Sequence, residues 1–210
     1  MATKKTTKKT TKQAAKAKAP TKAKTVLRGV ALVDAVMAHR EGKGEKLNGR
    51  SAKELAATKL GKLPLTPALE RWLSRDDDTF TLGEPQSFLE MMEQEFPEWV
   101  DGYAPIAPRL RAPVVLFEGW GSDSRRFLYL GKPDSHGEYP VMTIDTDDAP
   151  FLCVNGPADV WLAQQAGYLE DEKVYGHVPA AYLPAQQEQA KLNFGGDVIW
   201  NMEDGPFDDE

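Results

Sequence analysis

The sequence predicts an α+β domain, in which several helices pack around a small and mainly antiparallel sheet. Apolar residues recur at helical spacing between residues 25 and 96, and again between residues 157 and 169. Short β-favouring apolar runs lie between residues 114 and 154. No internal repeat indicates a solenoid, so the expected architecture is a single domain with appendages.

Composition and charge divide the 210 residues into an arm, an extension, a domain and a tail. Residues 1–24 are rich in Lys, Thr and Ala and contain too few apolar side chains to offset the entropy of ordering, so we expect a disordered arm. We expect residues 25–59 to be a helical extension, residues 60–195 the folded domain and residues 196–210 an acidic tail. The first 28 residues carry nine Lys, one Arg and no acid, or +10, and the rest carry −16, which together give −6.

Amphipathic segments predict the helices of the domain and of its extension. They cover residues 25–39, 51–60, 66–75, 85–96 and 180–192. Thr25 is the predicted cap of the first helix, and Ser51 and Glu54 have the spacing of a capping box at the start of the second. Each segment has one apolar face, which we expect to pack on the sheet.

Four apolar runs predict the strands, at residues 114–117, 127–130, 141–144 and 151–154. The last two are joined by an acidic turn, and a helix beginning near Pro157 follows them. Asp159 suits the positive end of that helix, Trp161 lies on its apolar face, and Gly167 is a plausible stop. We therefore expect two neighbouring strands with this helix folded onto one face of the sheet.

Several short motifs occur in this order along residues 60 to 170. They are Leu63–Leu69, Gly102–Ala107, Phe127–Leu130, Gly137–Val141, Asp145–Asp148 and Val160–Ala163. In these motifs the chain resembles the SUKH superfamily, which includes bacterial immunity proteins and Smi/Knr-like regulators of fungal cell-wall assembly. It departs from the family at residues 109–113, where many members have a glycine-rich turn. The resemblance implies an α+β domain that binds another protein without catalysis, and in toxin systems neutralises a cognate toxin.

Acidic residues around the predicted turn are the first candidate site. Glu138, Asp145, Asp147 and Asp148 are expected to contact a basic partner, and an ordinary solvated turn or a divalent-cation site are the alternatives. The spacing lacks the glycine and distal glutamate of an EF-hand loop, so we expect no metal and no cofactor. Trp99 and Trp120 follow an acid and a glycine in loop-like contexts, and we consider them as interface anchors or as core residues.

The lysine-rich arm is the second candidate site. Its first lysines are Lys4, Lys5, Lys8, Lys9 and Lys12. Lysines without interleaved aromatic residues attract phosphates but do not read bases, so weak and non-specific nucleic-acid binding is the expected activity. A solubilising tail, or binding of the arm to the acidic body of the same protein, are the alternatives.

Motifs of the common enzyme classes do not occur in the sequence. It contains no phosphate-binding loop, no dinucleotide fingerprint and no nucleophile elbow, and His39, His136 and His177 are far apart. The single cysteine, Cys153, lies in an apolar run, which indicates a buried side chain and is consistent with a reducing compartment. No apolar run is long enough to span a bilayer, so we expect a cytoplasmic protein without membrane contact.

The preferred hypothesis is therefore a non-enzymatic protein-binding domain, in the form of an immunity protein that neutralises a basic toxin. A nucleic-acid-associated protein tethered by its arm is the first alternative. An unrecognised enzyme is the second.

Overall fold

A computed structural model describes residues 26–58, 65–118, 124–146, 150–170 and 176–201. These residues form an α+β domain with one six-stranded antiparallel sheet, as the sequence predicted. The strands are β1 (Thr81–Leu82), β2 (Val114–Glu118), β3 (Ser124–Tyr129), β4 (Pro140–Asp145), β5 (Phe151–Pro157) and β6 (Ile199–Asn201). Their order in the sheet is their order in the sequence, so each pairs with its neighbours along the chain.

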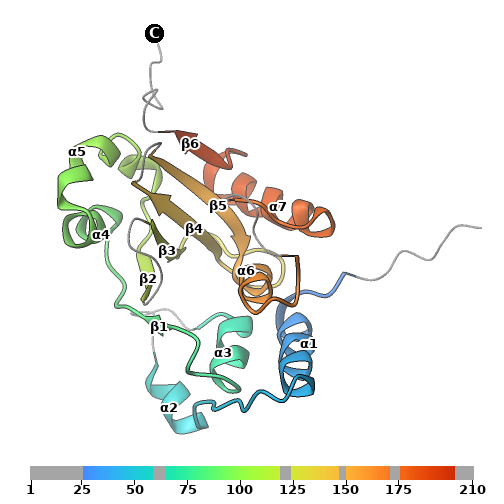
Figure 1. Cartoon of the computed structure of the whole chain (residues 1–210). Helices are drawn as coiled ribbons and strands as arrows, with labels where there is room; N and C mark the ends of the chain where they lie inside the picture. The colour runs from blue at the N-terminus through green and yellow to red at the C-terminus, as the bar shows by residue number, and fades with distance from the viewer. Residues whose placement is uncertain (1–25, 59–64, 119–123, 147–149, 171–175, 202–210) are drawn as a thin grey trace, which may run out of the picture.

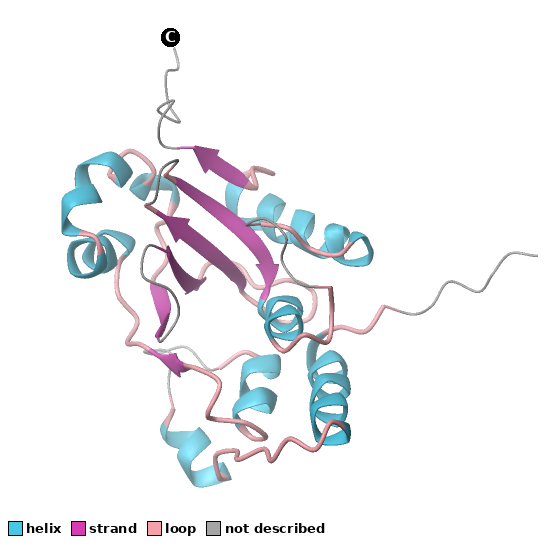
Figure 2. Cartoon of the chain, viewed as in Figure 1, coloured by secondary structure: helices cyan, strands magenta, loops and turns pink. Residues whose placement is uncertain are grey.

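The helices lie on both sides of this sheet (Figures 1 and 2). They are α1 (Gly29–Gly42), α2 (Ala52–Ala57), α3 (Pro67–Leu73), α4 (Phe88–Glu95), α5 (Val100–Tyr103), α6 (Ala158–Gln165) and α7 (Leu183–Phe194), with short 3-10 turns at Pro97–Trp99, Ala107–Arg109 and Ala180–Tyr182. The predicted capping box of Ser51 and Glu54 is present, and Ser87 and Glu90 form a second one at the start of α4.

One face of the sheet is covered by α1, α3 and α6. Val115 and Phe117 of β2 point to this face and share a hydrophobic cluster with Met37, Trp72 and Trp161. The centroids of the Phe117 and Trp161 rings lie 4.7 Å apart. The prediction that the helix carrying Trp161 covers the sheet is therefore confirmed.

The opposite face is covered by α4 and α5, together with the end of α7. Val114 and Leu116, which alternate with Val115 and Phe117 along β2, point to this side. There the Phe88 ring of α4 lies 6.0 Å from the Phe127 ring of β3, between centroids. Both faces of the central strands β4 and β5 are buried. Their sequences are therefore continuous apolar runs and do not alternate between apolar and polar residues.

Three details differ from the sequence-based expectations. The first concerns the extension, because α1 supplies Leu32, Val33, Val36 and Met37 to the main core and is part of the domain. The second concerns the acidic tail, since β6 lies inside residues 196–210 and pairs with β5. The third concerns the start of α1, whose N-cap is Arg28 without a side-chain capping bond, whereas Thr25 lies outside the described residues.

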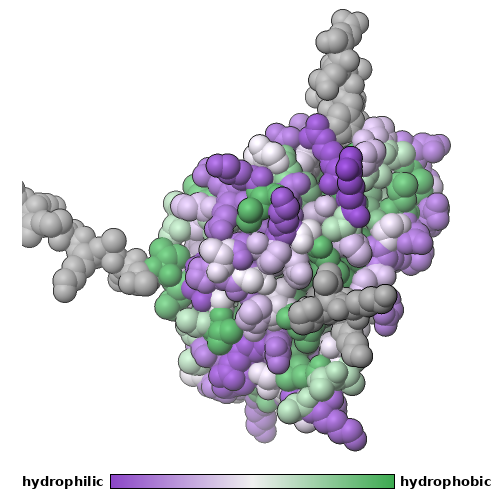
Figure 3. Space-filling view, turned by 180° about the vertical axis from the view of Figure 1, so that it is seen from behind, coloured by the Kyte–Doolittle hydropathy of each residue, from purple (hydrophilic) through white to green (hydrophobic). Residues whose placement is uncertain are grey.

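Hydrophilic and apolar side chains are interspersed on the face of the molecule that Figure 3 shows. Figure 3 shows one apolar patch beside the point where the N-terminal segment leaves the domain, and Val26, Leu27 and Val30 are 44%, 38% and 40% exposed there. None of the described helices combines the length and the apolar character needed to cross a bilayer.

Candidate functional site

Glu138 is not on the surface, which corrects its assignment as a partner contact. Glu138 lies two residues before the start of β4, and its exposed fraction is 0%. Its Oε1 accepts a hydrogen bond of 2.9 Å from the backbone N–H of Ala68, in the first turn of α3, and its Oε2 has no hydrogen-bond partner among the residues that the structure describes. A carboxylate held in this way cannot reach a partner protein, so its role lies inside the fold.

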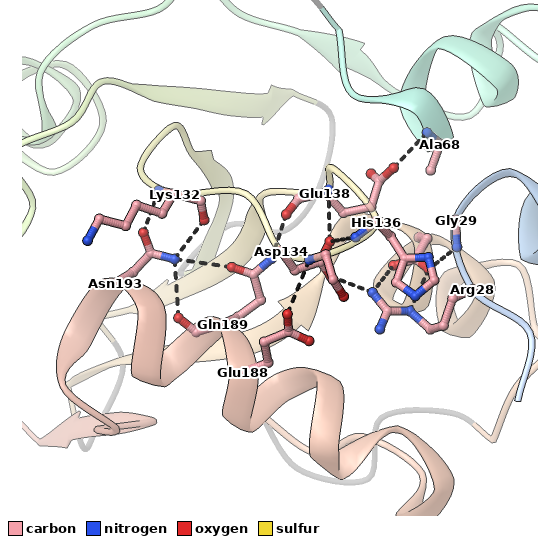
Figure 4. A network of polar contacts seen from close by, with 12 residues as sticks. Arg28, Gly29, Ala68, Lys132, Asp134, His136, Glu138, Glu188, Gln189 and Asn193 are labelled. Atoms are coloured by element: carbon pink, nitrogen blue, oxygen red, sulfur yellow. Dashed lines mark hydrogen bonds and ion pairs between the residues drawn. The ribbon is translucent and has the colours of Figure 1, made fainter.

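Glu138 belongs to a buried polar network that joins segments far apart in the sequence (Figure 4). Asp134 Oδ1 accepts bonds from the backbone N–H groups of His136 and Glu138, at 2.8 and 3.0 Å. The Glu138 carbonyl accepts a bond from the side-chain amide of Gln189 in α7. The loop that precedes β4 is thereby fixed to α3 on one side and to α7 on the other.

Arg28 connects the same loop to α1 and α6. Its guanidinium donates to Asp134 at 2.5 Å and to Asp159 at 2.7 Å, and both carboxylates are fully buried. Asp159 also accepts a bond from the backbone N–H of Gly29, so it caps α1 from 130 residues away. Asp159 therefore does more than interact with the dipole of its own helix: it ties that helix to α1.

The environment of Glu138 favours its neutral form. Burial raises the pKa of Glu138 to about 7, and the negative charges of Asp159 and Asp134 act in the same direction. Hydrogen bonding to the carboxylate opposes this shift but does not cancel it. For Arg28, burial alone would lower the pKa of the guanidinium. Its hydrogen bonds and charge interactions with Asp159 and Asp134 outweigh this effect, so the pKa of Arg28 is raised. The network is thus an ion-paired structural core with one carboxyl group that protonates near neutral pH.

Asp145 is also largely buried, with 6% of its surface exposed at the end of β4. Its backbone carbonyl accepts a hydrogen bond of 2.6 Å from the Tyr103 hydroxyl of α5. The expectation that it contacts a partner from an exposed turn is therefore wrong for this side chain. Asp147 and Asp148 lie outside the described residues, so the acidic turn itself stays a prediction.

The two tryptophans proposed as interface anchors have different outcomes. Trp99 ends the 3-10 turn between α4 and α5, is half-buried, and packs on the core beneath these helices. Its ring also lies against Gly102, where a Cβ atom would be 4.0 Å from Cε3. Trp99 therefore packs against the core and remains partly exposed to solvent. Trp120 lies outside the described residues.

The structure brings together a different acidic surface around Trp99. We define the α4–α5 surface by the exposed residues Leu89, Glu90, Glu93, Glu98 and Asp101 together with the half-buried Trp99. Glu93, Glu98 and Asp101 form no ion pair with any described residue, whereas Glu95 is paired with Arg125 at 2.6 Å. Leu89, in the first turn of α4, is 36% exposed.

The sequence contains a signal for this surface, outside the predicted acidic turn. Between residues 76 and 108 the chain has nine acidic residues and neither Lys nor Arg. The helical period of α4 places its apolar residues Phe88, Met91 and Met92 in the core, so its acids face outward. The charge imbalance therefore becomes a surface property once this segment folds onto the sheet.

The remaining predicted site residues, the lysines of the arm, lie outside the residues that the structure describes. Lys4, Lys5, Lys8, Lys9 and Lys12 belong to residues 1–25, for which the structure gives no placement. Among the residues that are placed, no group of three His, Cys, Asp or Glu side chains could hold a metal ion. Cys153 is buried and donates to the side-chain oxygen of Asn155, in agreement with its assignment to the core.

Comparison of the chain with family models, with curated proteins and with solved structures found no match. The SUKH resemblance therefore stays a prediction from the sequence motifs.

Proposed function

We propose that this protein is a non-catalytic protein-binding module of the cytoplasm, and that it binds a basic partner through the α4–α5 surface. The observation that carries the proposal is the combination of four exposed carboxylates with a half-buried tryptophan and an exposed leucine along α4, the following 3-10 turn and α5. Aromatic residues at the centre of a patch supply binding energy, while a rim of one charge steers an oppositely charged partner.

The position of this surface on the fold supports the same role. The helices α4 and α5 are short, and they are fixed to the sheet by Phe88, Met92 and Tyr103. A surface of this kind is pre-organised, so binding does not require the ordering of a loop. Neutralisation of a cognate toxin, which the SUKH resemblance implies, is the specific form of the function that we propose, since nucleases present basic surfaces to their substrates.

The test compares the intact protein with two variants of equal charge change. Glu93→Lys/Glu98→Lys reverses two unpaired carboxylates of the α4–α5 surface, and Glu90 is left intact because it caps α4. Glu70→Lys/Asp78→Lys reverses two exposed acids near α3, on the other side of the sheet, as the matched control. Each protein is immobilised and exposed to an extract of its native cells, and the proteins retained are quantified by mass spectrometry.

We expect a basic protein that is retained by the wild type and by the control but lost from the surface variant. With that partner purified, its affinity should fall about tenfold or more in the variant at about 50 mM salt and less at higher salt, because the reversed charges mainly slow association. Equal affinities and equal salt dependence for all three proteins would contradict the proposal.

Nucleic-acid tethering by the arm is the second candidate function, and the charge separation in the sequence favours it. The first 28 residues contain no acid, and because Arg28 is bound to two buried carboxylates, the rest of their positive charge is that of the nine lysines. Deleting residues 1–24 should then abolish a salt-sensitive affinity for generic duplex DNA. An intact protein with no affinity at about 50 mM salt would contradict this function.

A further inference from the structure

The described part of the molecule contains a cleft whose charge is opposite to that of the α4–α5 surface. The cleft has a volume of about 950 Å³ and lies between the Ala107–Arg109 turn, the end of β3 and the C-terminal end of α7. Three cationic side chains line it, Arg109, Arg111 and Lys132, together with one acid, Asp197, so that the lining carries a net charge of +2. A cleft of this volume is large enough for a small-molecule ligand.

Two of the three cations have hydrogen-bond donors to offer a ligand. Arg109 pairs with Asp197 at 2.9 Å, but no acid among the described residues pairs with Arg111 or Lys132. The Nε of Arg111 donates to the Pro108 carbonyl at 2.8 Å, which orients the guanidinium and leaves its two terminal nitrogens without a partner among the described residues. A guanidinium can donate two parallel bonds to a carboxylate or a phosphate, and the ammonium of Lys132 adds a second positive charge.

The backbone that carries these side chains is held firmly in place. The side chain of Asn193 in α7 binds both the N–H and the carbonyl of Lys132, at 2.6 and 3.0 Å (Figure 4). A Cβ atom at Gly131 would collide with Asn193 Oδ1 and with the Tyr129 ring, so the close approach of the two segments requires glycine there. The rings of Tyr129 and Phe194 pack below, with their centroids 5.2 Å apart. The cleft is therefore pre-organised, which reduces the entropic cost of binding a ligand.

The balance of charge in the cleft favours an anion. The C-terminal end of α7 contributes a partial negative charge of about half a unit, which opposes an anion. The N–H groups of Gly195 and Gly196 already donate to the Ala190 carbonyl at this end, and the net charge of the lining side chains is larger and positive. The lining also has an apolar part, because Leu192 is 37% exposed at the cleft. A ligand that matches both parts has an anionic group and an apolar group.

We propose that this cleft binds a small organic anion, in which a phosphate or carboxylate group is attached to an apolar body. The anionic group contacts Arg111 and Lys132, and the apolar body packs on Leu192. This site is separate from the α4–α5 surface, so the proposal does not depend on the binding of a basic partner there.

The test uses the full chain labelled with ¹⁵N and follows the amide resonances of Gly131, Lys132 and Asn193, which line the cleft. Phenyl phosphate and isophthalate are titrated separately at about 25 mM salt, where charge attraction is weakly screened. The two probes distinguish phosphate from carboxylate as the preferred anionic group. We expect saturable shifts of these amides with at least one of the probes.

Two double variants of equal charge change locate the binding. Arg111→Gln/Lys132→Gln should weaken the affinity for that probe by about fivefold or more, because it removes both unpaired cations of the cleft. Lys43→Gln/Lys46→Gln removes two exposed lysines outside the cleft and should bind as tightly as the wild type. All four residues are exposed, so both variants should fold.

Probes without a ring test the apolar part of the site. Inorganic phosphate and malonate should bind about threefold or more weakly than phenyl phosphate and isophthalate, respectively, and Leu192→Ala should reduce this difference. The absence of saturable shifts with either ring-containing probe up to about 20 mM would overturn the proposal. Equal affinity of the wild type and of Arg111→Gln/Lys132→Gln would overturn it as well, as would equal affinity for the probes with and without a ring.

Discussion

Replacing Glu138 by Gln should remove a pH dependence from the stability of this protein. The folded state raises the pKa of Glu138 from 4.5 to about 7, chiefly through burial. Folded protein therefore binds this proton more tightly than unfolded protein, and the free energy of unfolding falls as pH rises from about 4.5 to 7. The loss amounts to about 3 kcal/mol once pH exceeds both values, of which roughly 2 to 3 kcal/mol falls between pH 5 and 8.

Gln is the appropriate replacement because its amide oxygen can still accept the bond from Ala68 N–H. Its NH₂ group cannot ionise, so the variant should gain about 2 to 3 kcal/mol relative to the wild type between pH 5 and pH 8. A constant offset from burying the amide does not affect this difference. The carboxylates with lowered pKa values, such as Asp76, titrate below this range.

The assay is urea unfolding at pH 5, 6, 7 and 8, with the midpoint and slope recorded for each protein. Glu70→Gln, which removes an exposed carboxylate from the same helix that Glu138 contacts, serves as the control and should follow the wild type. Parallel curves for the wild type and Glu138→Gln across this range would refute the reasoning, since they would show that Glu138 binds no extra proton on folding.

Three further predictions concern stability. Arg28→Met should destabilise the fold by about 3 to 5 kcal/mol in urea, because it leaves Asp134 and Asp159 buried without their cation; a loss below about 1 kcal/mol would contradict the network. Ser87→Ala should cost about 1 kcal/mol through the lost cap of α4, and more than Ser51→Ala, because α2 contains no buried residue; equal thermal shifts would be the contrary result. Deleting residues 1–24 should leave the thermal midpoint within a few degrees, and a larger fall would show that the arm contributes to folding.

The main helices and strands were predictable because they depend on local patterns. The four apolar runs became β2 to β5, and α3 lies within the segment 66–75 that was predicted to be a helix. The two edge strands were missed for a physical reason. With two residues in β1 and three in β6, they are too short to show alternation, and the neighbouring strands define them.

The candidate site was less predictable, because burial of a charged residue depends on partners far away in the sequence. Nothing near Glu138 indicates that the N–H of Ala68, 70 residues earlier, will meet it in the interior. The sequence by itself determined the fold class, the capping box of Ser51 and Glu54 and the acidic character of residues 76–108, since composition and periodicity are local properties. Only the tertiary structure decided which acids lie inside with Arg28 and which face solvent around Trp99, because that depends on which helix ends meet when the helices pack on the sheet.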